Sequence, residues 1–222
     1  MPSCLLETVQ GLIERTYAMR RLPRVERFIV GDEGYRRFGL DAAAQSVGAG
    51  DADGARTLVR ETEAGLRCAI YYPDDVIRRL EAHPPQQGLN EENVEAFATF
   101  VEELDHLLLI AERVECQRPV TLFELELHAN VTKHLVLARF LVGKRRQLSE
   151  QRRRWLAREL FEAGEFCDPD PEVRQRYRDA GRWAVRLLGA LRPLGSAARV
   201  AALRAFHAAD TGGKLELIGR LT

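Results

Sequence analysis

The sequence lacks the cysteine spacing, the signal peptide and the long apolar run that mark three classes of protein. None of its four cysteines is three residues from another, so neither a zinc knuckle nor a redox CxxC pair is present. No stretch of 18 consecutive apolar residues occurs, which excludes a membrane-spanning helix. The first residues lack the basic start and apolar run of a secretory signal. We therefore expect a cytoplasmic protein with free thiols.

The sequence also lacks an excess of charge of either sign, and it contains very little lysine. Its 33 basic and 33 acidic side chains cancel, and only three of the basic ones are lysines. A net charge of zero gives no support to binding of nucleic acid or of a membrane surface. The expected partner is a protein or peptide that the sequence does not identify. The 222 residues are enough for one large domain or two small ones with a substantial core.

Apolar and alternating segments predict a small sheet in the first third of the chain. Residues 27–32 have the pattern of a short buried strand that ends at a glycine turn. Residues 56–72 have the pattern of a hairpin, because apolar and polar side chains alternate in its second arm. Residues 41–54 are small and polar, which predicts a loop. Together these segments predict a sheet of about three strands.

From residue 90 onward the pattern is helical. Helices are expected near 91–114, 121–143, 149–164, 171–191 and 196–220, the last interrupted at Gly212–Gly213. The predicted fold class is therefore α+β and predominantly helical, with a small N-terminal sheet followed by a C-terminal helical array. Residues 1–145 are expected to form an α+β lobe and residues 146–222 a helical lobe, unless the two form a single domain.

Two of these helices carry polar side chains where burial is expected. In helix 91–114, Glu102 and His106 lie one turn apart, where the helix passes from an exposed to a buried face. Helix 121–143 is apolar nearly all round, yet it contains Glu124, Glu126, His128, Asn130 and His134. A buried carboxylate is costly unless it is paired or binds a metal ion. The two helices are therefore candidates to supply metal ligands.

The stretch E-E-L-D-H at 102–106 resembles the H-E-x-x-H motif of zincin metallopeptidases, in which two histidines one turn apart bind zinc. In the gluzincin branch of these enzymes the third ligand is a glutamate on the next helix. Glu126 follows His106 by twenty residues. The resemblance implies that Glu102, His106 and Glu126 bind a divalent metal ion and that this ion activates water for hydrolysis.

The same resemblance implies catalytic roles for neighbouring side chains. Glu103 takes the place of the general base that accepts a proton from the metal-bound water, and His128 or His134 would stabilise the oxyanion. Glu102 stands where the motif has its first histidine, so the site has one imidazole and two carboxylates. Such a ligand set is harder and more anionic than that of a zincin. The expected cofactor is therefore a divalent metal, either zinc or manganese or iron.

Two other functions fit the same residues. In the first nothing is catalytic: the acids pair with arginines, the histidines are satisfied within their helices, and the protein is a non-enzymatic interaction or scaffold protein. The second is a carboxylate-bridged di-metal helical protein, in which Glu103 and His106 supply one E-x-x-H motif. Glu124 and His128 are four residues apart rather than three, and the predicted sheet argues against a pure four-helix bundle. We take a zincin-like, metal-dependent hydrolase as the working hypothesis.

Overall fold

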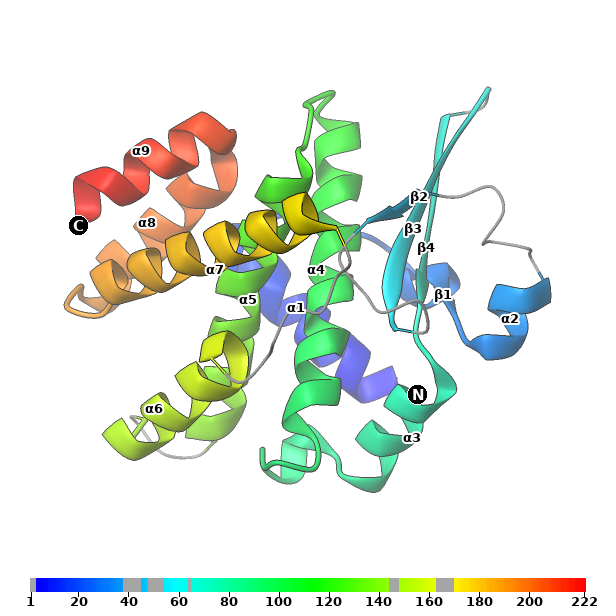
Figure 1. Ribbon diagram of the computed structural model, residues 1–222, viewed down its shortest axis with the longest axis horizontal. Helices are drawn as coiled ribbons and strands as arrows, with labels where there is room; N and C mark the ends of the chain where they lie inside the picture. The colour runs from blue at the N-terminus through cyan, green and yellow to red at the C-terminus, as the bar shows by residue number, and fades with distance from the viewer. Residues whose placement is uncertain (1–2, 38–44, 48–53, 64, 144–147, 163–169) are drawn as a thin grey trace.

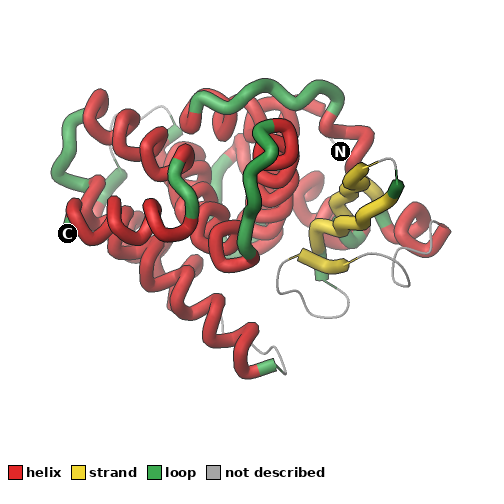
Figure 2. Tube along the Cα trace, turned by 90° about the horizontal axis from the view of Figure 1, so that it is seen from above, coloured by secondary structure: helices red, strands yellow, loops and turns green. Residues whose placement is uncertain are grey.

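The protein combines one small sheet with a larger array of helices. The computed structural model describes residues 3–37, 45–47, 54–63, 65–143, 148–162 and 170–222. The sheet lies at one end of the molecule and helices make up the rest (Figures 1 and 2). This arrangement confirms the predicted α+β, predominantly helical fold. None of the described helices is long and apolar enough to cross a membrane.

The described part of the chain forms a four-stranded sheet in the order β1-β4-β3-β2. Its strands are β1 (Ile29–Val30), β2 (Gln45–Val47), β3 (Arg56–Thr62) and β4 (Gly65–Tyr71). β3 and β4 form the predicted antiparallel hairpin, and β1 pairs with β4 in parallel. The sheet is therefore mixed, with the hairpin at its centre.

Two details of the sheet differ from the prediction. The strand predicted at 27–32 is only two residues long, because a 3-10 turn occupies Val25–Phe28 and Asp32 begins the next helix. β2 lies within the predicted loop 41–54, where its backbone pairs with the otherwise free edge of β3. Residues 41–44 and 48–53 of that loop lie outside the described residues.

From residue 90 onward the helices follow the predicted order along the chain, and three more precede them in the described part of the chain. They are α1 (Ser3–Tyr17), α2 (Asp32–Arg37), α3 (Asp74–Ala82), α4 (Val94–Glu115), α5 (Leu122–Val142), α6 (Glu150–Ala157), α7 (Pro171–Leu191), α8 (Ser196–Ala208) and α9 (Thr211–Leu221). A π-helical turn, Arg158–Glu162, extends α6. Thr121 starts α5 as its N-cap, since its side chain accepts a hydrogen bond from the backbone N–H of Glu124.

The last predicted helix is divided at a different place from the one expected. The prediction put the interruption at Gly212–Gly213, but both glycines lie inside α9. The break falls at Ala209 and Asp210 instead. The side chain of Asp210 accepts a hydrogen bond from the backbone N–H of Gly213 at 2.8 Å, so the new helix begins at this N-cap.

The core is built around α4 and α5, which lie side by side at the centre of the molecule (Figure 1). The apolar side of α4 is buried, as Val101, Leu104 and Leu108 show. α5 packs against α4 on one side and α7 on another, which confirms that this nearly all-apolar helix is buried on most sides. One hydrophobic cluster extends from Leu5 in α1 to Ile218 in α9. The division of the chain into two lobes near residue 145 stays a prediction.

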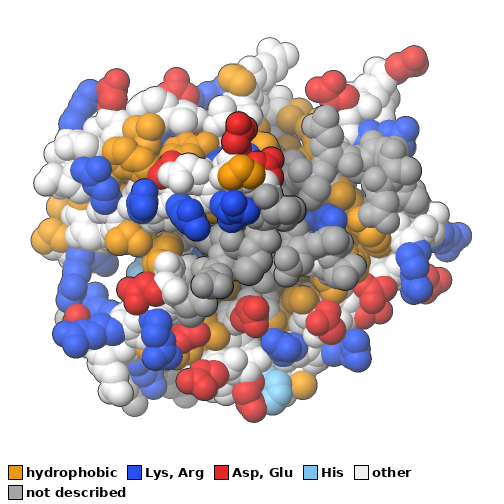
Figure 3. All heavy atoms as spheres, viewed as in Figure 1, with side chains coloured by type: hydrophobic (Ala, Val, Ile, Leu, Met, Phe, Trp, Pro, Cys, Tyr) orange, Lys and Arg blue, Asp and Glu red, His pale blue; other side chains and the backbone are white. Residues whose placement is uncertain are grey.

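The surface carries charge of both signs. Basic side chains (blue) and acidic side chains (red) both occur across the face shown in Figure 3, as the zero net charge predicts. The unusual charged groups are in the interior, where several carboxylates and imidazoles of α4 and α5 are withdrawn from solvent. These buried groups define the candidate site.

Candidate metal centre

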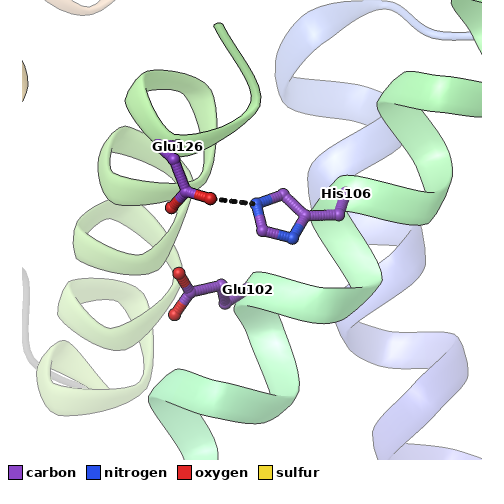
Figure 4. Close-up of side chains that lie close together, drawn as sticks. All are labelled: Glu102, His106 and Glu126. Atoms are coloured by element: carbon purple, nitrogen blue, oxygen red, sulfur yellow. Dashed lines mark ion pairs between the residues drawn. The ribbon is translucent and has the colours of Figure 1, made fainter. Parts of the chain in front are cut away.

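The three predicted metal ligands converge between α4 and α5. Glu102 and His106 project from successive turns of α4, and Glu126 projects toward them from α5 (Figure 4). One ligand atom from each side chain lies within 4.8 Å of the other two. The ligands of a tetrahedral zinc ion lie about 3.4 Å apart, given bonds of about 2.1 Å. A shift of about 1 Å in flexible carboxylate side chains would therefore complete the coordination.

His106 is the group that most needs a partner. Its side chain is fully buried, and neither ring nitrogen makes a hydrogen bond within the described part of the chain. Nε2 lies 4.0 Å from Oε1 of Glu126, which is itself fully buried, and the Oε2 of Glu126 has no hydrogen-bond partner among the described residues. Buried polar atoms without partners are rare and costly in folded proteins. A cation between these atoms would satisfy them.

Glu103 approaches the other side of the His106 ring. Its Oε2 lies 3.5 Å from Nδ1 of His106 and accepts a hydrogen bond from Oγ1 of Thr57 at 2.7 Å. Thr57 belongs to β3, so the sheet supports this carboxylate from outside the helix pair. A carboxylate on one imidazole nitrogen orients the ring and makes the opposite nitrogen a better ligand. In this arrangement Glu103 directs Nε2 of His106 toward Glu126.

Two further side chains contact the ligand set, and sequence reasoning missed both. Nζ of Lys133 donates to Oε2 of Glu102 at 2.8 Å, and the hydroxyl of Tyr177 donates to Oε1 of Glu126 at 2.7 Å. Lys133 follows Glu126 by seven residues, which is two turns of the same helix face and was visible in the sequence. Tyr177 comes from α7, and no local pattern links it to residue 126.

The acids around His106 hold a proton on it. Burial by itself disfavours the charged imidazolium, but Glu103, then Glu126 and Glu102, outweigh burial and raise the pKa of His106 to about 9. Burial raises the pKa of Glu126 to about 7, against the attraction of His106. Burial also raises the pKa of Glu103. In the absence of a metal ion, His106 is therefore protonated at neutral pH, and a metal ion has to displace that proton.

The structure does not bring His128 to the three ligands. Its Nδ1 lies 2.7 Å from Oδ2 of Asp105, and its Nε2 lies 3.0 Å from Nδ1 of His207, so both ring nitrogens are engaged elsewhere. His207, from α8, continues this chain of contacts to Oε2 of Glu112 at 2.5 Å. Asp105 and His207 were not singled out from the sequence. They are linked only through His128, and His207 reaches that ring from α8, 79 residues further along the chain.

Glu124 and His134 of α5 also lie outside the ligand cluster. Glu124 is held by Arg113 at 2.7 Å and by Lys214 at 2.9 Å. His134 stacks on Phe161 with ring centroids 6.2 Å apart, and burial lowers its pKa to about 4. Of the residues predicted for the site, Glu102, His106 and Glu126 therefore come together with Glu103 beside them, whereas His128 and His134 do not join them.

Comparisons of the chain with protein-family models, with curated proteins and with solved structures give no match. The resemblance to zincins therefore rests on the E-E-L-D-H stretch and the position of Glu126 alone. What the site can do has to be argued from its own geometry.

Proposed function

We propose that this protein binds a divalent metal ion through Glu102, His106 and Glu126 and uses it for zincin-like hydrolysis. The observation that carries the proposal is a fully buried His106 that makes no hydrogen bond within the described chain and points Nε2 at a buried carboxylate. One imidazole and two carboxylates suit zinc, manganese or iron. Three protein ligands leave a coordination position free, and a metal ion there lowers the pKa of bound water, toward about 7 for zinc.

Access to the site is from the side of Glu102. The Glu102 side chain is 21% exposed, whereas His106 and Glu126 are 0% exposed. Water and substrate would therefore approach over Glu102. Because β3 and Glu103 close the opposite side of the His106 ring, the free coordination position of a bound ion is expected to face the same way as Glu102.

Glu103 is the proposed proton acceptor and also the group that orients His106. Burial raises the pKa of Glu103, and general-base catalysis at neutral pH requires a shift in this direction. Its Oε2, however, is shared between Thr57 and His106, so accepting a proton from water requires the carboxylate to turn toward the open side. The orienting role needs no such movement. His128, with both nitrogens engaged, is not part of the proposed mechanism.

A second candidate function has support from the charges at the site. Lys133 already neutralises Glu102, Tyr177 already donates to Glu126, and protonated His106 lies between acids. These groups form a cluster that is close to neutral without any metal ion. In that case the protein is a non-enzymatic interaction or scaffold protein whose interior ion cluster serves stability.

Metal uptake separates the two functions. The purified protein is treated with chelator, dialysed against Zn²⁺ or Mn²⁺ and analysed for bound metal, beside His106→Gln and Glu126→Gln. Glu95→Gln is the matched control, because Glu95 lies on α4 but its side chain is 84% exposed. The metal-dependent hydrolase predicts close to one bound ion per chain in the wild type and in the control. It also predicts that both site variants lose the ion while circular dichroism shows that they are folded. A wild type that takes up neither ion supports the interaction protein.

Hydrolysis itself needs a separate measurement. The metal-loaded wild type is incubated with a panel of peptide and ester substrates, beside the chelated protein and Glu103→Gln. The hydrolase proposal predicts turnover that chelation abolishes and that Glu103→Gln reduces by about 100-fold or more, the usual contribution of a general base. A loaded protein that binds the ion but cleaves none of the substrates restricts the proposal to metal binding.

A further inference from the structure

The proposed function leaves the presence of Lys133 at the site unexplained. Its ammonium group contacts Oε2 of Glu102 at 2.8 Å, so it is hydrogen-bonded to one of the three proposed metal ligands. The Lys133 side chain is only 10% exposed. A lysine seldom gives up its hydration to this extent unless it is paired, so the contact with Glu102 is a specific, partly buried ion pair.

The ammonium and a metal ion compete for the same carboxylate. Glu102 has to turn an oxygen toward His106 and Glu126 to complete the ligand set, while Lys133 draws Oε2 in its own direction. The two cations also repel each other, and this repulsion is screened only weakly because the pair is mostly withdrawn from solvent. A bound ion is therefore most stable when the Lys133–Glu102 contact has been broken.

Lys133 can leave without disturbing the rest of the site. It sits on the same side as Glu102, where the cluster meets solvent, whereas His106 and Glu126 are fully enclosed. The long flexible lysine side chain can extend its ammonium into water while its stem stays packed. Release of the amine therefore requires rotation of side-chain bonds rather than movement of α5.

We infer that Lys133 is the built-in counter-ion of the Glu102 carboxylate. Its ammonium group pairs with Glu102 in the metal-free protein and is displaced into solvent when a divalent ion binds. This inference rests on the proposed metal binding. In this role Lys133 lowers the affinity of the site for the metal ion, so that the site fills only above a certain concentration of free ion. It also predicts that metal binding uncovers a free ammonium group beside the open position.

The first test measures affinity. Zn²⁺ and Mn²⁺ are titrated calorimetrically at one fixed pH into the wild type, Lys133→Met and Lys133→Arg. Lys133→Met keeps the length of the side chain but removes the charge, and it should bind the ion at least about tenfold more tightly, as expected for removal of a nearby like charge. Lys133→Arg keeps the charge and should not bind more tightly than the wild type. Equal or weaker binding by Lys133→Met, with a wild type that does bind, overturns the inference.

The second test measures the amine directly. Lysine acylation is followed by mass spectrometry in the wild type with and without Zn²⁺, and Lys214, which is fully buried against Glu124, is the internal reference. Displacement predicts faster acylation of Lys133 on metal addition and no change at Lys214. Unchanged reactivity of Lys133 in the metal-bound protein contradicts displacement.

The two proposals fail in different ways. If neither the wild type nor Lys133→Met takes up an ion, metal binding itself is wrong and the inference falls with it. If the wild type binds and only the affinity or acylation results are negative, metal binding stands and the role of Lys133 is wrong. Uptake by Lys133→Met alone would mean that the ion pair excludes the ion from the natural protein, and it would overturn both the native metal centre and the displacement of Lys133 by an ion.

Discussion

Nε2 of His106 faces Oε1 of Glu126 across the boundary between α4 and α5, at 4.0 Å and with both side chains fully buried. Neither ring nitrogen of His106 has a hydrogen-bond partner in the described chain. Two buried groups at this distance, with Oε2 of Glu126 also lacking a hydrogen-bond partner among the described residues, are well placed to share a cation but too far apart for a direct hydrogen bond. The proposed metal binding depends on this pair.

Metal affinity is predicted to depend steeply on pH. Because the pKa of His106 is about 9, a metal ion has to displace its proton at every pH below that value. The dissociation constant should therefore fall by about tenfold for each unit of pH between 7 and 9. Calorimetry in buffers of different ionisation enthalpy gives the affinity and the number of protons released. Binding that does not vary with pH over this range would exclude His106 as a ligand.

The metal-free protein is predicted to lose stability as pH rises. The pKa of His106 is raised from 6.5 to about 9, so the folded state binds its proton more tightly than the unfolded state. The resulting stability is fully present below pH 6.5 and is lost as pH rises through 9. Urea denaturation of chelated protein should show a smaller difference between the wild type and His106→Gln at pH 9.5 than at pH 6.5. A difference that grows with pH contradicts the assignment.

Thr57→Val is predicted to weaken both the fold and the metal site. The substitution removes the hydrogen bond to the buried carboxylate of Glu103, which costs about 1–3 kcal/mol of unfolding free energy. It also frees the group that orients His106, so metal affinity should fall by about tenfold or more. Thr62→Val is the matched control, since Thr62 lies on the same strand and its hydroxyl bonds the exposed backbone of Gly65. Urea denaturation and metal titration of both variants check the prediction. Equal losses of stability and of metal affinity in Thr57→Val and Thr62→Val would contradict it.

Asp105→Asn is predicted to affect stability without affecting metal stoichiometry. Asp105 contacts His128, whose other nitrogen contacts His207, and these buried groups are separate from the metal ligands. Weakening a hydrogen bond to a buried carboxylate should cost about 1.5–3 kcal/mol of unfolding free energy. Metal analysis of the folded variant should still give close to one ion per chain. If Asp105→Asn lost the ion while keeping the stability of the wild type, the contacts from Asp105 through His128 to His207 would belong to the metal centre.

The helices and the meeting of Glu102, His106 and Glu126 were predictable because their signals are local. The period of apolar residues located α4, and the spacing of four between Glu102 and His106 placed both on one helix face. Glu126 stood out because a carboxylate on a nearly all-apolar helix needs a partner. These arguments require no knowledge of how distant segments pack.

The contacts that the sequence did not predict all depend on tertiary packing. Thr57 reaches Glu103 from β3, Tyr177 reaches Glu126 from α7, and His207 reaches His128 from α8. Each pair is more than 45 residues apart, so no helical or strand period links its members. The assignment of His128 to the oxyanion assumed that polar groups of one buried helix share one site. The structure shows instead that α5 presents different polar groups to α7, α8 and α9.

The most direct test of the account is an anomalous difference map from crystals of the protein soaked in Zn²⁺ or Mn²⁺. The account predicts one strong peak between α4 and α5, about 2.0–2.2 Å from Nε2 of His106 and from oxygens of Glu102 and Glu126, with Nζ of Lys133 withdrawn from Glu102. No peak at these residues, with the Lys133–Glu102 ion pair intact, would contradict it and would make the buried cluster a structural one.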